Sequence, residues 1–177
     1  MLNKPPRLRK QKLNRLFIDG LGDRVQFHND EDSVPLLIDL KPPYSLKLRV
    51  YLFNCTNPPG GRALDEYKVQ VILPGQVRGR RASLDFSEGR MPILAAYVNE
   101  GNNGVFVMWD ANKHDGFAYS TNMQVKAEII IKAFCSPLAL SKRKNNEIII
   151  ACRPQYIYEA ICRRIEIMTQ EILRGEM

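Results

Sequence analysis

The sequence predicts a mainly β domain of the α+β class, a small barrel with helices packed at its open ends. Short segments with strand patterns follow one another between about residues 34 and 110, and strands at such spacing are typical of small barrels and sandwiches. Helical periodicity appears only late, after residue 122. The length of 177 residues and the hydrophobic content of 45% suit one domain with one core.

Each predicted strand alternates apolar and polar residues or is wholly apolar, and each is bounded by turn-forming residues. The predicted strands are residues 46–53, 67–73, 83–86, 93–98, 105–109 and 147–151. Asn102-Asn103-Gly104 stands between the fourth and fifth of them and is a good tight-turn sequence, so we expect a hairpin there. The single domain then consists of a basic segment 1–33, a barrel core 34–152 and a C-terminal helix 153–174.

Two helices are predicted late in the chain. Asn122 suits the N-cap of a helix near residues 123–135, inserted in the barrel core. Pro154 suits the first turn of the C-terminal helix, along which isoleucines recur at every fourth position. We interpret that stripe as core packing rather than as a docking face for another protein. The leucines that precede Phe17 allow a short amphipathic helix in the basic segment.

The charge balance favours a polyanionic partner. The formal net charge is +7 and the pI is about 9.3, and lysine or arginine contacts to phosphates release condensed counterions. No apolar run approaches the roughly 20 residues that span a bilayer, and the first residues lack the apolar core of a signal peptide. We therefore expect a soluble cytoplasmic protein without a membrane partner, or a piece of a larger one.

The cysteines are expected to be free thiols. No two of them stand two residues apart, and only His28 and His114 are available to complete a metal site. Zinc sites usually show closely paired ligands, so we expect no metal site. All four have apolar neighbours and are predicted to be buried, and they are Cys55, Cys135, Cys152 and Cys162.

Two long polar loops carry the richest chemistry. The first, residues 54–68, mixes prolines with glycines, a combination that presents side chains from a shaped scaffold. The second, residues 110–124, follows Trp109, which we interpret as a core residue, and a solvent-facing turn is the alternative interpretation of this loop. Residues 76–81 concentrate three arginines, which either clamp phosphates or form an exposed basic turn.

The motifs in these loops resemble a known family. Residues 57–62 followed by 65–70, and residues 105–111 followed by 119–125, are similar to the B-three-like pseudobarrel DNA-recognition domains of bacterial restriction endonucleases. The resemblance covers residues 45–165 and is nearest to the NgoAVII-like branch of the group formed by NgoAVII, BfiI and EcoRII.

The resemblance implies a seven-stranded open pseudobarrel with flanking helices, which grips the major groove of double-stranded DNA with two arms. The first arm corresponds to the first loop. The second is either the turn at Asn99–Gly104 or the loop Asp110–Gln124, and we put more weight on the latter because it holds more polar side chains. Arginine contacts guanine, asparagine contacts adenine, and carboxylates accept from cytosine.

Two sets of DNA-contacting residues follow from the resemblance and the loop chemistry. The base-contacting set is Asn57, Arg62, Asp65, Glu66, Lys68, Asp110, Asn112, Lys113, His114, Tyr119, Ser120 and Asn122. The phosphate-contacting set is Arg7, Arg9, Lys10, Arg78, Arg80, Arg81 and Gln124. We expect no catalytic residue, metal or cofactor in this chain. The resemblance therefore implies a restriction endonuclease whose catalytic centre lies elsewhere, in a separate nuclease domain or in a partner subunit.

A nuclease centre within this chain is the alternative. Glu66-Tyr67-Lys68 has the Glu-x-Lys spelling of Mg²⁺-dependent nucleases, and Asp39 is the available second carboxylate. This spelling arises often by chance, and Asp39 lacks the usual preceding proline. The paired His-x-Lys motif of phospholipase-D-type nucleases is absent, because His114 is followed by Asp115-Gly116.

Overall fold

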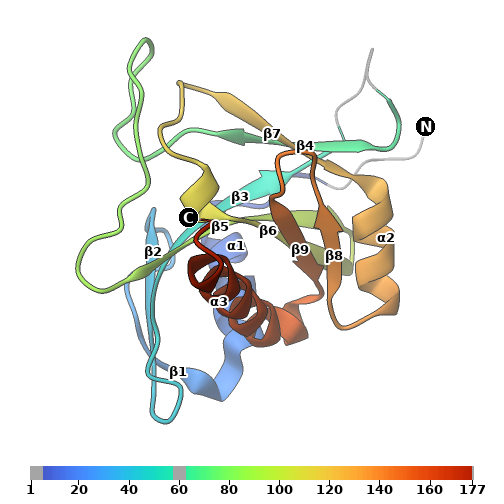
Figure 1. Ribbon diagram of the computed structural model, residues 1–177. Helices are drawn as coiled ribbons and strands as arrows, with labels where there is room; N and C mark the ends of the chain where they lie inside the picture. Colours follow the sequence, from blue (N-terminus) through green and yellow to red (C-terminus); the bar gives the residue numbers. More distant parts are fainter. Residues whose placement is uncertain (1–5, 58–62, 177) are drawn as a thin grey trace.

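A seven-stranded mixed sheet forms the body of the computed structural model, which describes residues 6–57 and 63–176 (Figure 1). Its strand order is β1-β2-β3-β5-β6-β9-β8, and β3 and β5 are its parallel pair. The strands are β1 (Val25–His28), β2 (Leu36–Leu40), β3 (Lys47–Cys55), β5 (Met91–Glu100), β6 (Asn103–Trp109), β8 (Ala139–Lys142) and β9 (Ile148–Cys152). This arrangement confirms the mainly β, α+β fold class, and within the described ranges the sheet does not close into a barrel.

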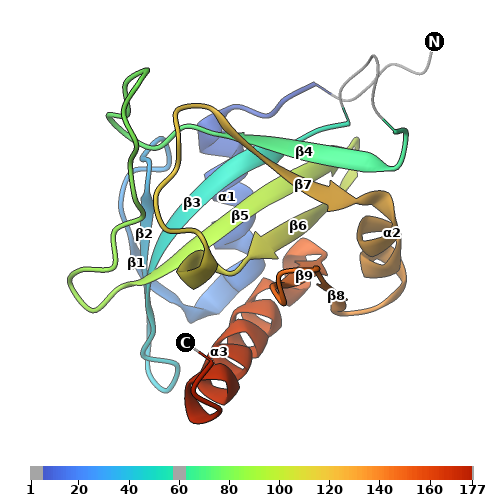
Figure 2. The ribbon, with the colours of Figure 1, turned by 45° about the horizontal axis from the view of Figure 1, so that its top comes forward.

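A two-stranded antiparallel ribbon of β4 (Glu66–Val71) and β7 (Thr121–Lys126) covers one face of the sheet. Val69 and Val71 of β4 and Met123 and Val125 of β7 point inward and join a buried cluster with Trp109. Helix α2 (Ala127–Cys135) directly follows β7 and contributes to the same cluster. Figure 2 shows the ribbon crossing the strands of the larger sheet.

The other face of the sheet is covered by α1 (Lys10–Leu21) and α3 (Ile157–Leu173), which is preceded by the 3-10 turn Pro154–Tyr156. Leu48, Val50 and Leu52 of β3 belong to the cluster on this side, whereas Tyr51 and Cys55 belong to the other. Because both faces of the central strands are covered, these strands are nearly continuous apolar runs. The expected C-terminal helix is confirmed.

The expected hairpin forms between β5 and β6, where Glu100 pairs with Asn103 across a turn at Gly101, whose φ is +76°. The predicted strand at residues 83–86 is wrong. Ala82 makes an isolated bridge with Phe117, and Leu84 is the one buried residue of segment 83–86 and packs in the cluster that contains Trp109. The alternation of an apolar Leu84 with polar neighbours resembles a strand, but this segment has no partner strand among the residues that the structure describes.

The predicted start of the inserted helix is also wrong, because residues 121–126 form β7 and the helix begins at Ala127. Met123 and Val125 are buried, while Asn122, Gln124 and Lys126 are exposed, and this period of two is that of a strand. Pairing with β4 decides the conformation, so Asn122 is not a cap. In the described part of the chain, no helix is long and apolar enough to cross a membrane.

Substitution of Gly20 by alanine is expected to lower the free energy of unfolding. A Cβ at this position would lie 2.4 Å from the carbonyl oxygen of Pro154 and 3.0 Å from Cγ2 of Ile157, where α1 meets the start of α3. Relief requires movement of backbone, which costs about 1–3 kcal/mol. Urea unfolding measures the change, with the exposed α1 variant Gln11→Ala as control. A Gly20→Ala protein as stable as wild type would contradict the expected clash between the two segments.

Candidate nucleic-acid interface

The outward face of the β4–β7 ribbon carries only polar side chains along its paired length. Glu66, Lys68 and Gln70 of β4 alternate with buried or half-buried residues, and their partners across the ribbon are Lys126, Gln124 and Asn122. Amide, ammonium and carboxylate groups therefore form a strip of three cross-strand pairs. Because all the apolar side chains of the ribbon face the sheet, the strip is free to meet a polar partner.

The two acidic side chains at one end of the strip both pair with Lys126. Its Nζ lies 3.1 Å from Oε1 of Glu66 and 3.3 Å from Oδ2 of Asp65. Hydrogen bonds to Glu66 and Asp65 raise the pKa of Lys126, so it stays charged. The carbonyl of Asp65 accepts from the amide of Ala127 at 2.7 Å, which fixes the first loop to the start of α2.

The first loop is closed by Asn57, whose Nδ2 donates to the carbonyl of Leu64 at 2.7 Å. Asp65 is exposed, and Lys68 is half-buried on the ribbon. Arg62, which the sequence placed among the base-contacting residues, lies outside the described residues. The first loop therefore contributes Asp65 and the ribbon residues that follow it.

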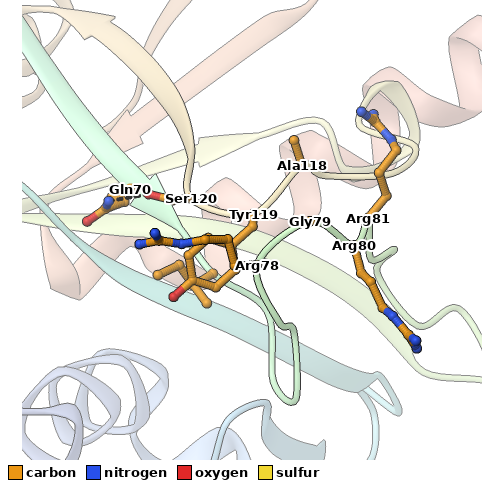
Figure 3. A pocket seen from close by; sticks show the side chains of 9 residues that line it. Gln70, Arg78, Gly79, Arg80, Arg81, Ala118, Tyr119 and Ser120 are labelled. Carbon is orange, nitrogen blue, oxygen red and sulfur yellow. Dashed lines mark hydrogen bonds between the residues drawn. The ribbon is translucent and has the colours of Figure 1, made fainter.

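A cleft of about 610 Å³ adjoins the other end of the strip (Figure 3). This arginine cleft is lined by Gln70, Ile72, Arg78, Gly79, Arg80, Arg81, Ala118, Tyr119 and Ser120. Nη2 of Arg81 donates to the carbonyl of Gly116 at 2.5 Å, and Figure 3 shows Arg80 pointing in a different direction from Arg81. The three arginines thus spread over the cleft instead of converging on one point.

The two segments that wall the arginine cleft are tied to each other. Nε2 of Gln76 donates to the carbonyls of Arg80, at 3.1 Å, and Phe117, at 2.8 Å. Gln70 donates from Nε2 to Oγ of Ser120, whose φ of +61° is in the left-handed region. Left-handed non-glycine residues gather at functional sites, where the surrounding structure holds them.

A second cleft, of about 330 Å³, lies along the N-terminal segment. This N-terminal cleft is lined by Arg7, Leu8, Lys10, Leu13, Val34, Phe53, Asn54, Gln70 and Ile72. Asn54 of β3 binds the segment from both sides, accepting from the amide of Leu8 at 2.9 Å and donating to its carbonyl at 3.0 Å. Asn99 also donates to the carbonyl of Pro6, at 3.1 Å. The segment is therefore held at the rim of the cleft.

Lys10 is held inside this segment. Its Nζ donates to the carbonyl of Leu52 and lies 5.4 Å from the centre of the Phe53 ring. Burial lowers the pKa of Lys10. Arg9 is exposed and stands immediately before α1, whereas Arg7 is exposed and lines the cleft. Arg7 is thus the cation of this segment that both is exposed and lines the cleft.

The two clefts meet at Gln70 and Ile72, which line both of them. Arg7 and the loop of Arg78–Arg81 are far apart in the sequence but flank the same stretch of β4. Within residues 6–57 and 63–176, no carboxylate is within ion-pair distance of five cations of this surface, Arg7, Lys68, Arg78, Arg80 and Arg81. We call the two clefts, together with the polar strip that runs from Gln70 to Glu66, the cationic face.

Four residues of the second loop lie outside the cationic face, because none of them lines either cleft or belongs to the polar strip. Asp110 is buried, with Oδ2 4.0 Å from Nη1 of Arg164, and burial raises its pKa. Asn112 donates its backbone amide to Oδ1 of Asp110 at 3.0 Å. Lys113 pairs with Glu171 at 3.2 Å and His114 with Glu147 at 2.6 Å, both beneath the loop. These contacts anchor the loop, so we leave the four out of the candidate interface and keep Tyr119, Ser120 and Asn122.

The two candidates for the second arm lie at opposite ends of the ribbon. Glu66 pairs with Lys126 next to the first loop, and Val71 pairs with Thr121 next to the loop that begins at Asp110. The turn at residues 99–104 shares the end of the first loop, where the hydroxyl of Tyr67 donates to Glu100 at 3.1 Å. The two sequence-predicted loops thus lie at the two ends of one polar strip.

The carboxylates of the nuclease alternative are held in different ion pairs. Asp39 of β2 pairs with Arg90 at 2.7 Å, and Glu66 pairs with Lys126 on the ribbon. Among the described residues, no group of three or more histidine, cysteine or acidic side chains is arranged to hold a metal ion. The cysteines are free, and Cys55 and Cys152 are buried as expected. Contrary to the expected burial, Cys135 at the end of α2 is exposed and Cys162 is half-buried.

Gln70, Ile72 and Asn54 were missed from the sequence. Gln70 stands at an outward position of the alternating segment 67–73, so its exposure was there to be found. Asn54 follows a strand that was itself predicted, but its two hydrogen bonds to Leu8 depend on a contact 46 positions away. Such a long-range contact leaves no local pattern.

Comparison with known proteins adds a family. The model of the family described as Methylase-associated X1 matches residues 46–161. The matched range includes the ribbon, the arginine cleft and the second loop. No curated protein and no solved structure matches the chain.

Proposed function

The chain belongs to the Methylase-associated X1 family, and from this premise we propose that it is a DNA-recognition module of a restriction-modification system. The association of the family with methylases supports that setting. In this proposal the chain binds double-stranded DNA and carries no catalytic centre or cofactor. A nuclease domain or subunit, supplied by the same system, would cut the DNA.

The observation that carries the proposal is the cationic face. Five of its cations, Arg7, Lys68, Arg78, Arg80 and Arg81, lack carboxylate partners among the described residues, whereas Lys126 and most acidic side chains of the described chain form ion pairs. Charges left unpaired on one concave surface attract a polyanion, because each phosphate contact releases condensed counterions. Duplex DNA offers phosphates on both sides of a groove, as the two clefts require.

The shape of the surface suits the major groove. A two-stranded β-ribbon is one of the elements that the major groove admits. With the polar strip against the base edges, Gln70, Asn122 and Gln124 would offer amides, which pair with adenine. The N-terminal cleft and the arginine cleft would then each hold one phosphate backbone. The base contacts thereby move from the two loops to the ribbon that joins them.

Selection of the full chain against a random duplex library tests this function. We expect enrichment of a short motif, and we expect Asn122→Ala to lower discrimination at one position by about 1–3 kcal/mol, the value of a bidentate base contact. Gln170→Ala, an exposed position on α3, serves as the matched control. Binding that never exceeds the affinity for unselected DNA would refute sequence recognition.

A further inference from the structure

Ile72 has an unusual position on the cationic face. It immediately follows β4, and because Val71 is fully buried, Ile72 points outward with Lys68 and Gln70. Its side chain is 38% exposed. It lines both clefts, and it is the large aliphatic side chain among the residues that line the arginine cleft. Of the two residues that line both clefts, Gln70 and Ile72, Ile72 is therefore the apolar one.

The neighbours of Ile72 leave this apolar spot accessible and in a fixed place. On one side, the hydrogen bond from Gln70 to Ser120 holds the adjacent amide. The pairing of Val71 with Thr121 fixes the backbone before it. Tyr119 and Arg78 line the same cleft. Ile72 is thus a rigid apolar contact surrounded by groups that form hydrogen bonds or bind phosphate.

The major groove offers one apolar group that such a residue can contact. Thymine presents its C5-methyl group there, next to the donor and acceptor groups of its base pair, and 5-methylcytosine presents a methyl group at the same ring position. Resting on the proposed function, we propose that Ile72 recognises the C5-methyl group of a pyrimidine in the bound site, while Gln70 lies against the neighbouring base edge. Methylation of cytosine at that position would then raise affinity.

The test uses pairs of duplexes that differ by one methyl group. In the selected motif, each thymine is replaced in turn by deoxyuridine and each cytosine by 5-methylcytosine, and fluorescence anisotropy gives the dissociation constants. At one position we expect the methyl group to tighten binding roughly fourfold, the ratio that corresponds to ~0.8 kcal/mol for one buried carbon group. In Ile72→Ser the two members of that pair should bind equally.

Two controls make the result specific. Ile131→Ser removes an exposed isoleucine from α2, where 63% of the side chain is exposed, and should keep the methyl preference. Thermal melting checks that the Ile72→Ser variant folds. We expect it to fold because Ile72 is partly exposed. Equal binding of every methyl pair by the wild type, or a preference that survives in Ile72→Ser, overturns this inference alone. Failure to select any motif overturns the proposed function and the inference together.

Discussion

The double variant Arg78→Ala, Arg80→Ala is expected to lose roughly tenfold to a hundredfold in affinity for every duplex. A hydrogen bond to a charged group contributes on the order of 1.5–3 kcal/mol, and water or neighbouring cations replace part of that loss. Both side chains are exposed on the wall of the arginine cleft and have no carboxylate partner in the described part of the chain. Phosphate contacts are blind to sequence, so the selected motif should stay the same while its affinity falls.

The salt dependence of binding distinguishes phosphate contacts from an indirect effect. Each lost phosphate contact reduces the magnitude of the slope of log K against log salt by about 0.9. For the double variant we therefore expect a slope that is smaller in magnitude by nearly two. The control is a second double variant, Lys142→Ala, Lys144→Ala, which removes the same amount of charge. Its two side chains are exposed at the end of β8 and in the turn after it. Equal weakening by this control would mean that net charge, rather than the cationic face, drives binding.

The fold was predictable where local pattern and tertiary pairing agree. The alternation of residues 67–73 predicts β4, and the apolar segments around Asn102-Asn103-Gly104 predict the β5–β6 hairpin. Residues 123–126 were assigned to a helix because Asn122 resembles a cap and Ile129 extends the apolar pattern. Their strand conformation comes from pairing with β4, a partner 50 or more positions away. Local propensity is weaker than such pairing.

The site was predictable in its parts rather than in its assembly. Charge alone singled out Arg7 and the Arg78–Arg81 patch, but Asn54 and Gln70 bring them to one surface. The opposite error concerns Asp110 and His114. Polar residues in a loop look available from the sequence, but here a buried network beneath the loop holds them. Burial of a charge depends on partners from other elements, in this case α3 and the residue before β9.

The substitution Glu147→Gln is expected to lower the free energy of unfolding by about 2–4 kcal/mol near pH 7, as removal of one member of a buried, hydrogen-bonded charge cluster does. Glu147 is fully buried. Oε1 accepts from the amide of Asp110 at 3.1 Å and from His114 at 2.6 Å, and Oε2 accepts from Arg143 at 3.0 Å. A glutamine amide would place a donor against the Arg143 donor and remove the charge that balances it.

The loss should depend on pH in a known direction. Burial by itself raises the pKa of Glu147, but hydrogen bonds from His114, Asp110 and Arg143, together with the charge of His114, outweigh burial and leave the pKa below its ordinary value of 4.5. A carboxyl whose pKa is lowered by folding stabilises the protein above its unfolded pKa, and this stabilisation is lost as the pH falls through the folded pKa. The gap between wild type and Glu147→Gln should therefore narrow on acidification.

Urea unfolding at several pH values measures this gap, and Glu128→Gln, on the exposed side of α2, should show little change at any of them. The outcome also bears on the cationic face. The ring of His114 stacks on the ring of Phe117. The carbonyl of Phe117 accepts a hydrogen bond from Gln76, and Tyr119, two residues further on, lines the arginine cleft. A gap that widens toward acid would mean that burial dominates at Glu147 and raises its pKa. A gap that closes shows that the hydrogen bonds to the buried carboxylate outweigh its burial.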